Sequence, residues 1–128
     1  MTSSIFYKFK KIDENESFFA VRDGYPVTPL HTLIIPKRHI LSFFELNEIE
    51  QGEIFSFLEK QKKSIMNEDS SVSAFNIGIN DGPDAGRSVD HLHIHLIPRR
   101  KGDMDNPRGG VRGVIPEKQK YERKEEII

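Results

Sequence analysis

The sequence predicts an α+β fold, an antiparallel sheet with one helix packed on one face. Three observations support this prediction. Segments typical of β-strands flank one long segment with helical periodicity, in the order strand, strand, helix, strand, strand. The chain has 128 residues, the length of a single domain. With 36% hydrophobic and 30% charged residues, its composition is that of an ordinary soluble globular protein rather than a disordered one.

Two strands are expected in the first forty residues. Phe18–Arg22 has high β-propensity and is followed by turn residues at 23–26. The apolar run His31–Ile35 predicts a strand that is buried on both faces and stopped by Pro36. The aromatic-rich segment Ile5–Phe9 fits either a strand or one turn of helix.

One helix is expected, over Leu46–Asn67. Its apolar residues recur approximately at helical spacing, with Glu, Lys and Gln on the other face. Asn47 suits the N-cap position, and Glu48 and Glu50 stand in the first turn, where the helix dipole favours acidic side chains. This amphipathic pattern predicts that one face of the helix packs on the sheet.

Two more strands are expected after the helix. The alternating segment Val72–Ile79 predicts a strand, and the glycine- and proline-containing segment Asn80–Gly86 predicts a loop. A last strand is expected over His91–Ile97, ended by Pro98.

The end of the chain carries weaker signals. Residues 101–113 lose periodicity, and the charged segment Glu117–Glu126 fits either a helix or a flexible tail. We therefore expect a domain over residues 1–100 and a C-terminal extension over 101–128, which is part of the same domain or flexible.

Composition excludes several classes of protein. The chain has no Cys, so disulfides, Cys-ligated metal sites and a Cys nucleophile are excluded. No apolar run has the length of a membrane span, and the N-terminal residues do not form a secretory signal. A net charge of -1 argues against a protein that coats nucleic acid. We expect a cytoplasmic protein with no membrane and no nucleic-acid partner.

The most informative segment is His91–Ile97, in which three of the five His alternate with aliphatic residues. Because side chains alternate faces in a strand, His91, His93 and His95 are expected on one face and the aliphatic residues on the other. Gly86 and Ser88 stand just upstream, in a loop able to offer backbone N–H groups. Imidazoles beside such a loop suit an anionic, phosphate-like ligand.

Four interpretations of this cluster compete. The histidines could be a solvated face, a metal site, a nucleotide-binding site without chemistry, or a site of covalent phosphoryl chemistry. A metal site is disfavoured because His91 and His95 would lie roughly 13 Å apart along a flat strand, and no His-Glu-x-x-His motif accompanies them. Covalent chemistry is favoured because neutral imidazole is a nucleophile near pH 7, and a neighbouring imidazolium can be an acid.

The segment His91–Ile97 also resembles the signature of the histidine triad (HIT) family. The loop Asn80–Asp90 resembles that of the diadenosine polyphosphate hydrolase branch, which includes the fragile histidine triad protein. The segment His31–Ile40 resembles the family's second strand, and the tail beyond Gly102 resembles that of bacterial members. The resemblance covers roughly residues 4–100 and implies a sheet of about five strands, continued across a homodimer.

The resemblance implies roles for four histidines. His93 would attack the α-phosphorus and form a nucleotidyl-histidine, with a backbone carbonyl near His91 holding its other ring nitrogen. His91 would contact phosphate oxygens, and His95 would assist the leaving group as general acid or hydrogen-bond donor. His31 would orient His95. No resident metal is implied, and Mg²⁺ bound with the substrate phosphates stays open.

The resemblance also implies a set of substrate contacts. Asn80 and Ser88 match positions that bind phosphate oxygens, Gly86 allows close backbone approach, and Asp23 matches the ribose ligand. The base pocket would be formed by apolar residues, namely Ile5, Phe6, Phe9 and Val21. Arg87 departs from the Gln or Thr common in the family, and it either adds a charge-assisted phosphate donor or points to solvent. The basic residues Arg99, Arg100, Lys101, Arg108 and Arg112 either steer a polyphosphate or form a solvated edge.

These observations predict a nucleotide hydrolase that cleaves dinucleoside polyphosphates at the α-phosphorus. Two rivals remain: a nucleoside phosphoramidase of the same family, and a nucleotide-binding or sensing protein with negligible turnover.

Overall fold

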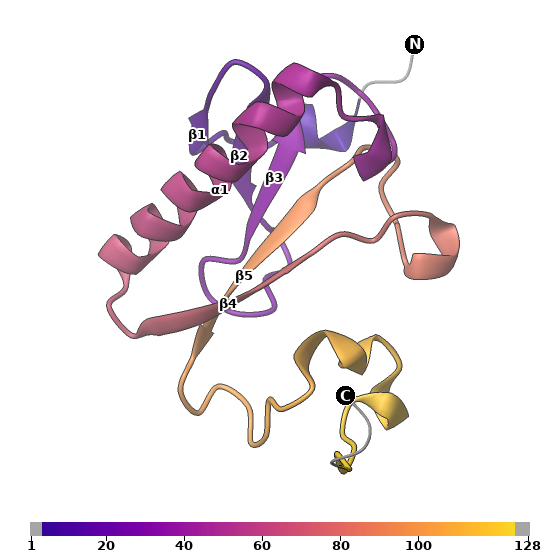
Figure 1. Ribbon diagram of the computed structural model, residues 1–128. Coiled ribbons are helices and arrows are strands. Elements are labelled where there is room, and N and C mark those ends of the chain that lie inside the picture. The colour runs from indigo at the N-terminus through magenta and orange to yellow at the C-terminus, as the bar shows by residue number, and fades with distance from the viewer. Residues whose placement is uncertain (1–3, 125–128) are drawn as a thin grey trace.

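The computed structural model describes residues 4–124, which form one five-stranded sheet, one long helix and several short 3₁₀ turns (Figure 1). The strands lie in the order β1-β2-β3-β5-β4, and all neighbouring pairs are antiparallel. Helix α1 joins β3 to β4 and crosses one face of the sheet (Figure 1). The α+β prediction is confirmed. The element bounds are β1 (Asp13–Glu14), β2 (Phe18–Arg22), β3 (Thr32–Pro36), α1 (Glu48–Glu68), β4 (Val72–Gly78) and β5 (Ile94–Arg100).

Helix α1 begins at a reciprocal capping box. The Asn47 side chain accepts from the Glu50 N–H at 2.8 Å, and the Glu50 carboxylate accepts from the Asn47 N–H at 2.9 Å. Two N–H groups that the helix cannot satisfy are thereby paired, which supports the predicted N-cap. Phe57 and Ile65 are the buried apolar residues of the helix, so α1 packs on the sheet by one face as expected.

The core lies on both faces of the central strands. The helix face holds a cluster of Phe18, Ala20, Ile34, Ile40, Leu46, Phe57, Leu92 and Ile94. The opposite face holds Phe6, Phe19, Val21, Leu33 and Ile35, and Phe6 comes from the 3₁₀ turn η1 (Ile5–Lys8). Every residue of β3 is buried, which confirms the prediction from its apolar run. The segment Ile5–Phe9 is thus a helical turn that covers the face opposite α1.

The structure corrects the strand predictions at three points. Strand β1 was not predicted, because a two-residue polar strand at the sheet edge has no apolar alternation to reveal it. Strand β5 starts at Ile94 rather than at His91, because Leu92 donates instead to the Ile40 carbonyl in the loop after β3, at 2.7 Å.

Pro98 does not end β5. Strand β3 pairs with β5 only as far as Leu96, so Pro98 has a strand neighbour on the β4 side alone. The Pro98 carbonyl accepts from the Thr28 hydroxyl on the other side at 2.6 Å. The N–H that proline lacks would point to that same side, so the β4 ladder does not need it and the strand continues to Arg100.

The C-terminal segment carries two short 3₁₀ turns, η4 (Gly110–Val114) and η5 (Pro116–Lys118), beyond the β4–β5 end of the sheet (Figure 1). The predicted segment Glu117–Glu126 therefore contains only the end of η5 within the described residues, and residues 125–126 lie outside them. Within residues 4–124, no helix combines the length and apolarity that crossing a bilayer requires.

Candidate active site

His93 has one imidazole nitrogen, Nε2, with no hydrogen-bond partner among residues 4–124. Its Nδ1 lies 2.7 Å from the His91 carbonyl oxygen. A carbonyl only accepts, so Nδ1 carries the proton and Nε2 of the neutral ring keeps its lone pair. The ring is buried and meets Phe6 edge-on, with centroids 4.9 Å apart. This arrangement holds an unprotonated nitrogen in a fixed direction, as a nucleophile requires.

Two hydrogen bonds in series fix the proton on His95. The Val27 N–H donates to His31 Nδ1 at 3.0 Å, so the proton of neutral His31 is on Nε2. His31 Nε2 lies 3.0 Å from His95 Nδ1 and therefore donates to it. The proton of neutral His95 is then on Nε2, a buried atom with no hydrogen-bond partner among the described residues. His95 is held ready to donate this proton or hydrogen bond to a ligand.

Burial keeps this pair of histidines neutral. The pKa of His95 is lowered to about 4, chiefly by burial and to a smaller extent by the neighbouring His93 and His31 rings. Burial also lowers the pKa of His31, against the opposing attraction of the Asp23 carboxylate 3.5 Å away. In the free protein at neutral pH, His95 is therefore a neutral hydrogen-bond donor, not the imidazolium acid that the sequence allowed.

The side chain of His91, which the resemblance places against phosphate oxygens, is enclosed by the protein. Its ring is fully buried, and its Nε2 donates to the Pro36 carbonyl at 2.8 Å and the Arg38 carbonyl at 3.2 Å. Although β5 begins only at Ile94, the alternation continues through His91, because the His91 and His93 rings both meet Phe6 while Leu92 and Ile94 pack in the helix-side core. The backbone carbonyl of His91 orients the His93 ring.

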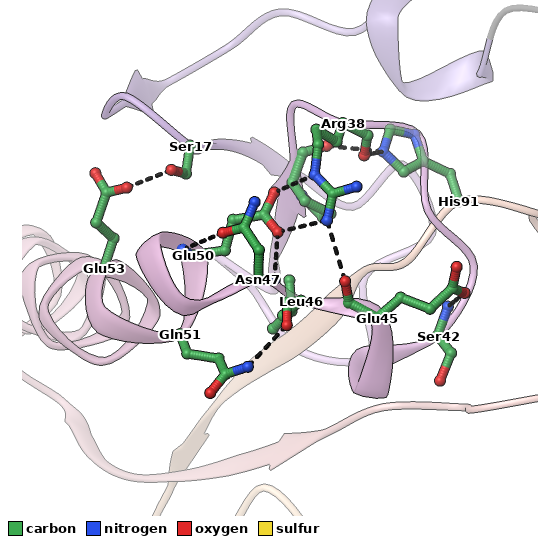
Figure 2. A network of polar contacts seen from close by, with 11 residues as sticks. Ser17, Arg38, Ser42, Glu45, Leu46, Asn47, Glu50, Gln51, Glu53 and His91 are labelled. Carbon is green, nitrogen blue, oxygen red and sulfur yellow. Dashed lines mark hydrogen bonds and ion pairs between the residues drawn. The ribbon is translucent and has the colours of Figure 1, made fainter.

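An ion pair that the sequence analysis missed supports this region (Figure 2). The Arg38 guanidinium binds both oxygens of the buried Glu50 carboxylate, at 2.7 and 2.9 Å. Because Glu50 also caps α1 and the Arg38 carbonyl receives His91, the contacts tie the helix start to the histidine loop. The Asn47–Glu50 spacing was a readable signal of the cap, but nothing in the sequence paired Glu50 with Arg38.

The loop before the triad is shaped by glycine and closed by an ion pair. Gly86 has φ +100°, a left-handed conformation that favours glycine. A Cβ placed there would lie 3.9 Å from the Asn80 amide, so conformation rather than crowding selects glycine. Arg87 is largely buried and binds Asp90 at 3.1 Å, whereas Ser88 is exposed. Arg87 therefore does not point freely to solvent, and its guanidinium forms an ion pair with Asp90.

The residues expected to hold base and ribose divide into two groups. Phe6 and Val21 are core residues, whereas Ile5 and Phe9 are exposed in and beside η1. Only Ile5 and Phe9 therefore leave much surface free for a base. Asp23 accepts from the Tyr25 N–H at 2.8 Å, which stabilises the turn after β2. Its other carboxylate oxygen lies 3.5 Å from His31 Nε2, beside the histidines of the site.

A metal site formed by Asp23, His31 and His95 is sterically conceivable, because one ligand atom of each lies within 4.8 Å of the others. The hydrogen bonds argue against it. His31 Nδ1 accepts from a backbone N–H, so the Nε2 atom facing the cluster carries a proton and has no lone pair for a metal.

Comparison with known proteins identifies the family. The sequence matches the HIT domain over residues 7–102. It is 37% identical to a bis(5'-nucleosyl)-tetraphosphatase (asymmetrical) of Schizosaccharomyces pombe, covering 80% of this chain and 52% of that protein. It is also 37% identical to an AP-4-A phosphorylase of Mycobacterium tuberculosis, covering 68% and 45%. The chain thus spans about half the length of these curated relatives.

Solved structures agree in fold. A HIT family protein from Bacillus anthracis aligns with a TM-score of 0.71 at 36% identity, covering 78% of this chain and 75% of that one. Sequence and architecture point to the same conclusion, and the chain belongs to the HIT domain family.

Proposed function

We propose that this protein is a nucleotide hydrolase that cleaves dinucleoside polyphosphates at an α-phosphorus through a nucleotidyl-His93 intermediate. One observation carries the proposal: His93 offers a lone pair at Nε2 while neighbouring His95 offers a proton at Nε2. The names of the relatives, a tetraphosphatase and an AP-4-A phosphorylase, support the substrate class.

In the first step, the His93 Nε2 lone pair forms a bond to the α-phosphorus. The bond from phosphorus to the bridging oxygen breaks, and the leaving nucleotide takes its electron pair. His95 Nε2–H donates a hydrogen bond to that oxygen, which lowers the cost of its developing charge. In the second step, water attacks the phosphorus, the bond from phosphorus to His93 breaks and returns its electron pair to Nε2, and the water's proton goes to solvent.

The proposal is tested by the products from diadenosine tetraphosphate, separated by chromatography in chelator-treated buffer with and without Mg²⁺. Attack at an α-phosphorus gives AMP plus ATP, and cleavage to two ADP contradicts it. His93→Ala should abolish turnover, with exposed His39→Ala as the matched control. Mass spectrometry of protein quenched in alkali should find an adenylyl group on His93, and its absence during steady turnover would exclude the intermediate.

The name phosphorylase favours one variation of the second step. If inorganic phosphate replaces water as the acceptor, the products become ADP plus ATP. Repeating the assay with added phosphate separates the two acceptors, because AMP persists only when water reacts.

The homodimer stays a proposal of the same kind. The outer edge of β4 has no strand partner among the described residues, and Ile77 on it is 54% exposed. An unpaired apolar edge favours strand pairing with a second copy. Light scattering should give the mass of a dimer, and Ile77→Lys should reduce it. The cytoplasmic location likewise stays a prediction from the sequence.

A further inference from the structure

A cavity of about 550 Å³ lies between the sheet and the C-terminal segment. Its floor includes Asn76 on β4 and Ile97 on β5, and its outer wall includes Met104, Val111 and Val114. Because Ile94 and Leu96 pack toward α1, alternation puts His95 and Ile97 on the opposite face, where this cavity opens. The volume is in the range of small-molecule pockets, roughly 300–1,000 Å³.

The cavity adjoins the histidines of the candidate active site. His31, His95 and Asn80 border it, whereas His93 and the η1 residues do not. His95 therefore separates the nucleophile from the cavity. A leaving group that receives the His95 hydrogen bond would extend into this space, on the side away from η1.

The outer wall is held in place by specific contacts. Asp103 accepts from Arg99 Nε and Nη2, both at 2.8 Å, while Arg99 Nη1 donates to Asn76 at 2.7 Å. These bonds lower the pKa of Asp103 to about 2. Gly109 has φ +96°, and a Cβ on it would overlap the Gln119 carbonyl oxygen. The wall is thus a defined structure that follows the matched HIT domain, which ends at residue 102.

The chemistry of the walls selects between occupants. The side chains are mostly aliphatic, and Arg99, the arginine that lines the cavity, is neutralised by Asp103. A bare phosphate chain would find little free positive charge there. A purine nucleoside would place its flat ring between aliphatic side chains. The side-chain oxygen of Asn76 accepts from Arg99, so its amide nitrogen is left to donate a hydrogen bond to an acceptor nitrogen of the purine ring.

We infer that the C-terminal segment forms the subsite for the second nucleoside, the one that departs with the leaving nucleotide. This inference rests on the proposed function. It makes residues 104–119 a specificity element that favours dinucleoside polyphosphates over mononucleotides with the same phosphate chain.

Binding tests the inference independently of turnover. Calorimetry with a methylene-bridged analogue of diadenosine tetraphosphate should give at least tenfold tighter binding than the matching adenosine tetraphosphate analogue, or about 1.4 kcal/mol. Val111→Trp, which fills the cavity, should remove this preference while leaving AMP affinity unchanged. Ile115→Trp is the matched control, a half-exposed residue of the same segment that does not line the cavity.

The outcomes separate the two proposals. Equal binding of both analogues to the wild-type protein, or an equal loss of AMP and dinucleotide binding in a folded Val111→Trp, overturns the inference. If Val111→Trp does not fold by circular dichroism, the wild-type comparison still decides. The dinucleotide preference without turnover would refute the proposed function and leave the subsite standing. Turnover without tighter binding of the dinucleotide analogue would refute the subsite and leave the proposed function standing.

Discussion

Acid should destabilise this protein before its carboxylates titrate, because its buried histidines must be neutral to fold. The pKa of His95 is about 4 in the folded protein, against 6.5 as the unperturbed value. Above pH 6.5 both states hold the neutral ring, so the effect is absent. As pH falls from 6.5 toward 4, the unfolded chain binds a proton that the folded protein does not, and stability is lost.

The two pKa values set the size of this loss. At pH 4.5 the unfolded ring is almost fully protonated and the folded ring largely neutral, which costs about 2 kcal/mol for His95 alone once partial solvent screening is allowed for. His31 and His91 also have a pKa lowered by burial, so they add to the loss in the same direction. Asp69 and Asp103, whose pKa values are about 2, act mainly below this window.

Urea unfolding followed by circular dichroism measures the effect, since the chain has no Trp for fluorescence. The free energy of unfolding should fall between pH 7.5 and 4.5 in the wild-type protein. His95→Gln should make that fall about 2 kcal/mol smaller. Identical pH dependence in the wild-type protein and His95→Gln would refute the burial argument.

Three further predictions follow from single contacts. Arg38→Ala should lower the free energy of unfolding by about 2 kcal/mol, because it leaves buried Glu50 without its ion-pair partner; an unchanged urea midpoint would contradict this. His31→Ala should lower kcat about tenfold, because the proton of His95 is then no longer confined to Nε2. His31→Gln, which keeps an N–H donor, should recover part of the lost kcat in the product assay. Equal kcat values for the two variants would argue that His31 does not fix the position of this proton. Gly86→Ala should cost about 1 kcal/mol through its positive φ alone, since no atom crowds the position, and thermal melting would show a larger loss if packing mattered.

Several features were readable because each depends on local chemistry. Asn47 could be recognised as a cap because its side chain bonds within one turn of helix. The burial of β3 followed from an unbroken apolar run, and the family was indicated by the resemblance of the triad, the loop before it and the upstream strand to known family motifs. The bounds of β2 and β4 came out within one residue of the structure.

Other features required the folded chain because they join distant segments. His91 Nε2 donates to the carbonyl of Pro36, 55 residues away, so the last residue of β3 fixes the first histidine of the triad. The cavity bordered by His95 brings β4, β5 and the C-terminal segment together, and no periodicity in residues 101–113 indicated it.

The sequence by itself determined the fold class, the helix with its cap and the family, because repeating patterns and local hydrogen bonds are written in neighbouring residues. Only the tertiary structure decided the proton positions on the histidines. The donor to His31 is a backbone N–H four residues away, and the partner of His95 is 64 residues away. A ring's tautomer is set by whichever group the fold places against it; the family resemblance implied the partners of His93 and His95, but the Val27 N–H that sets the proton on His31 appears only in the folded chain.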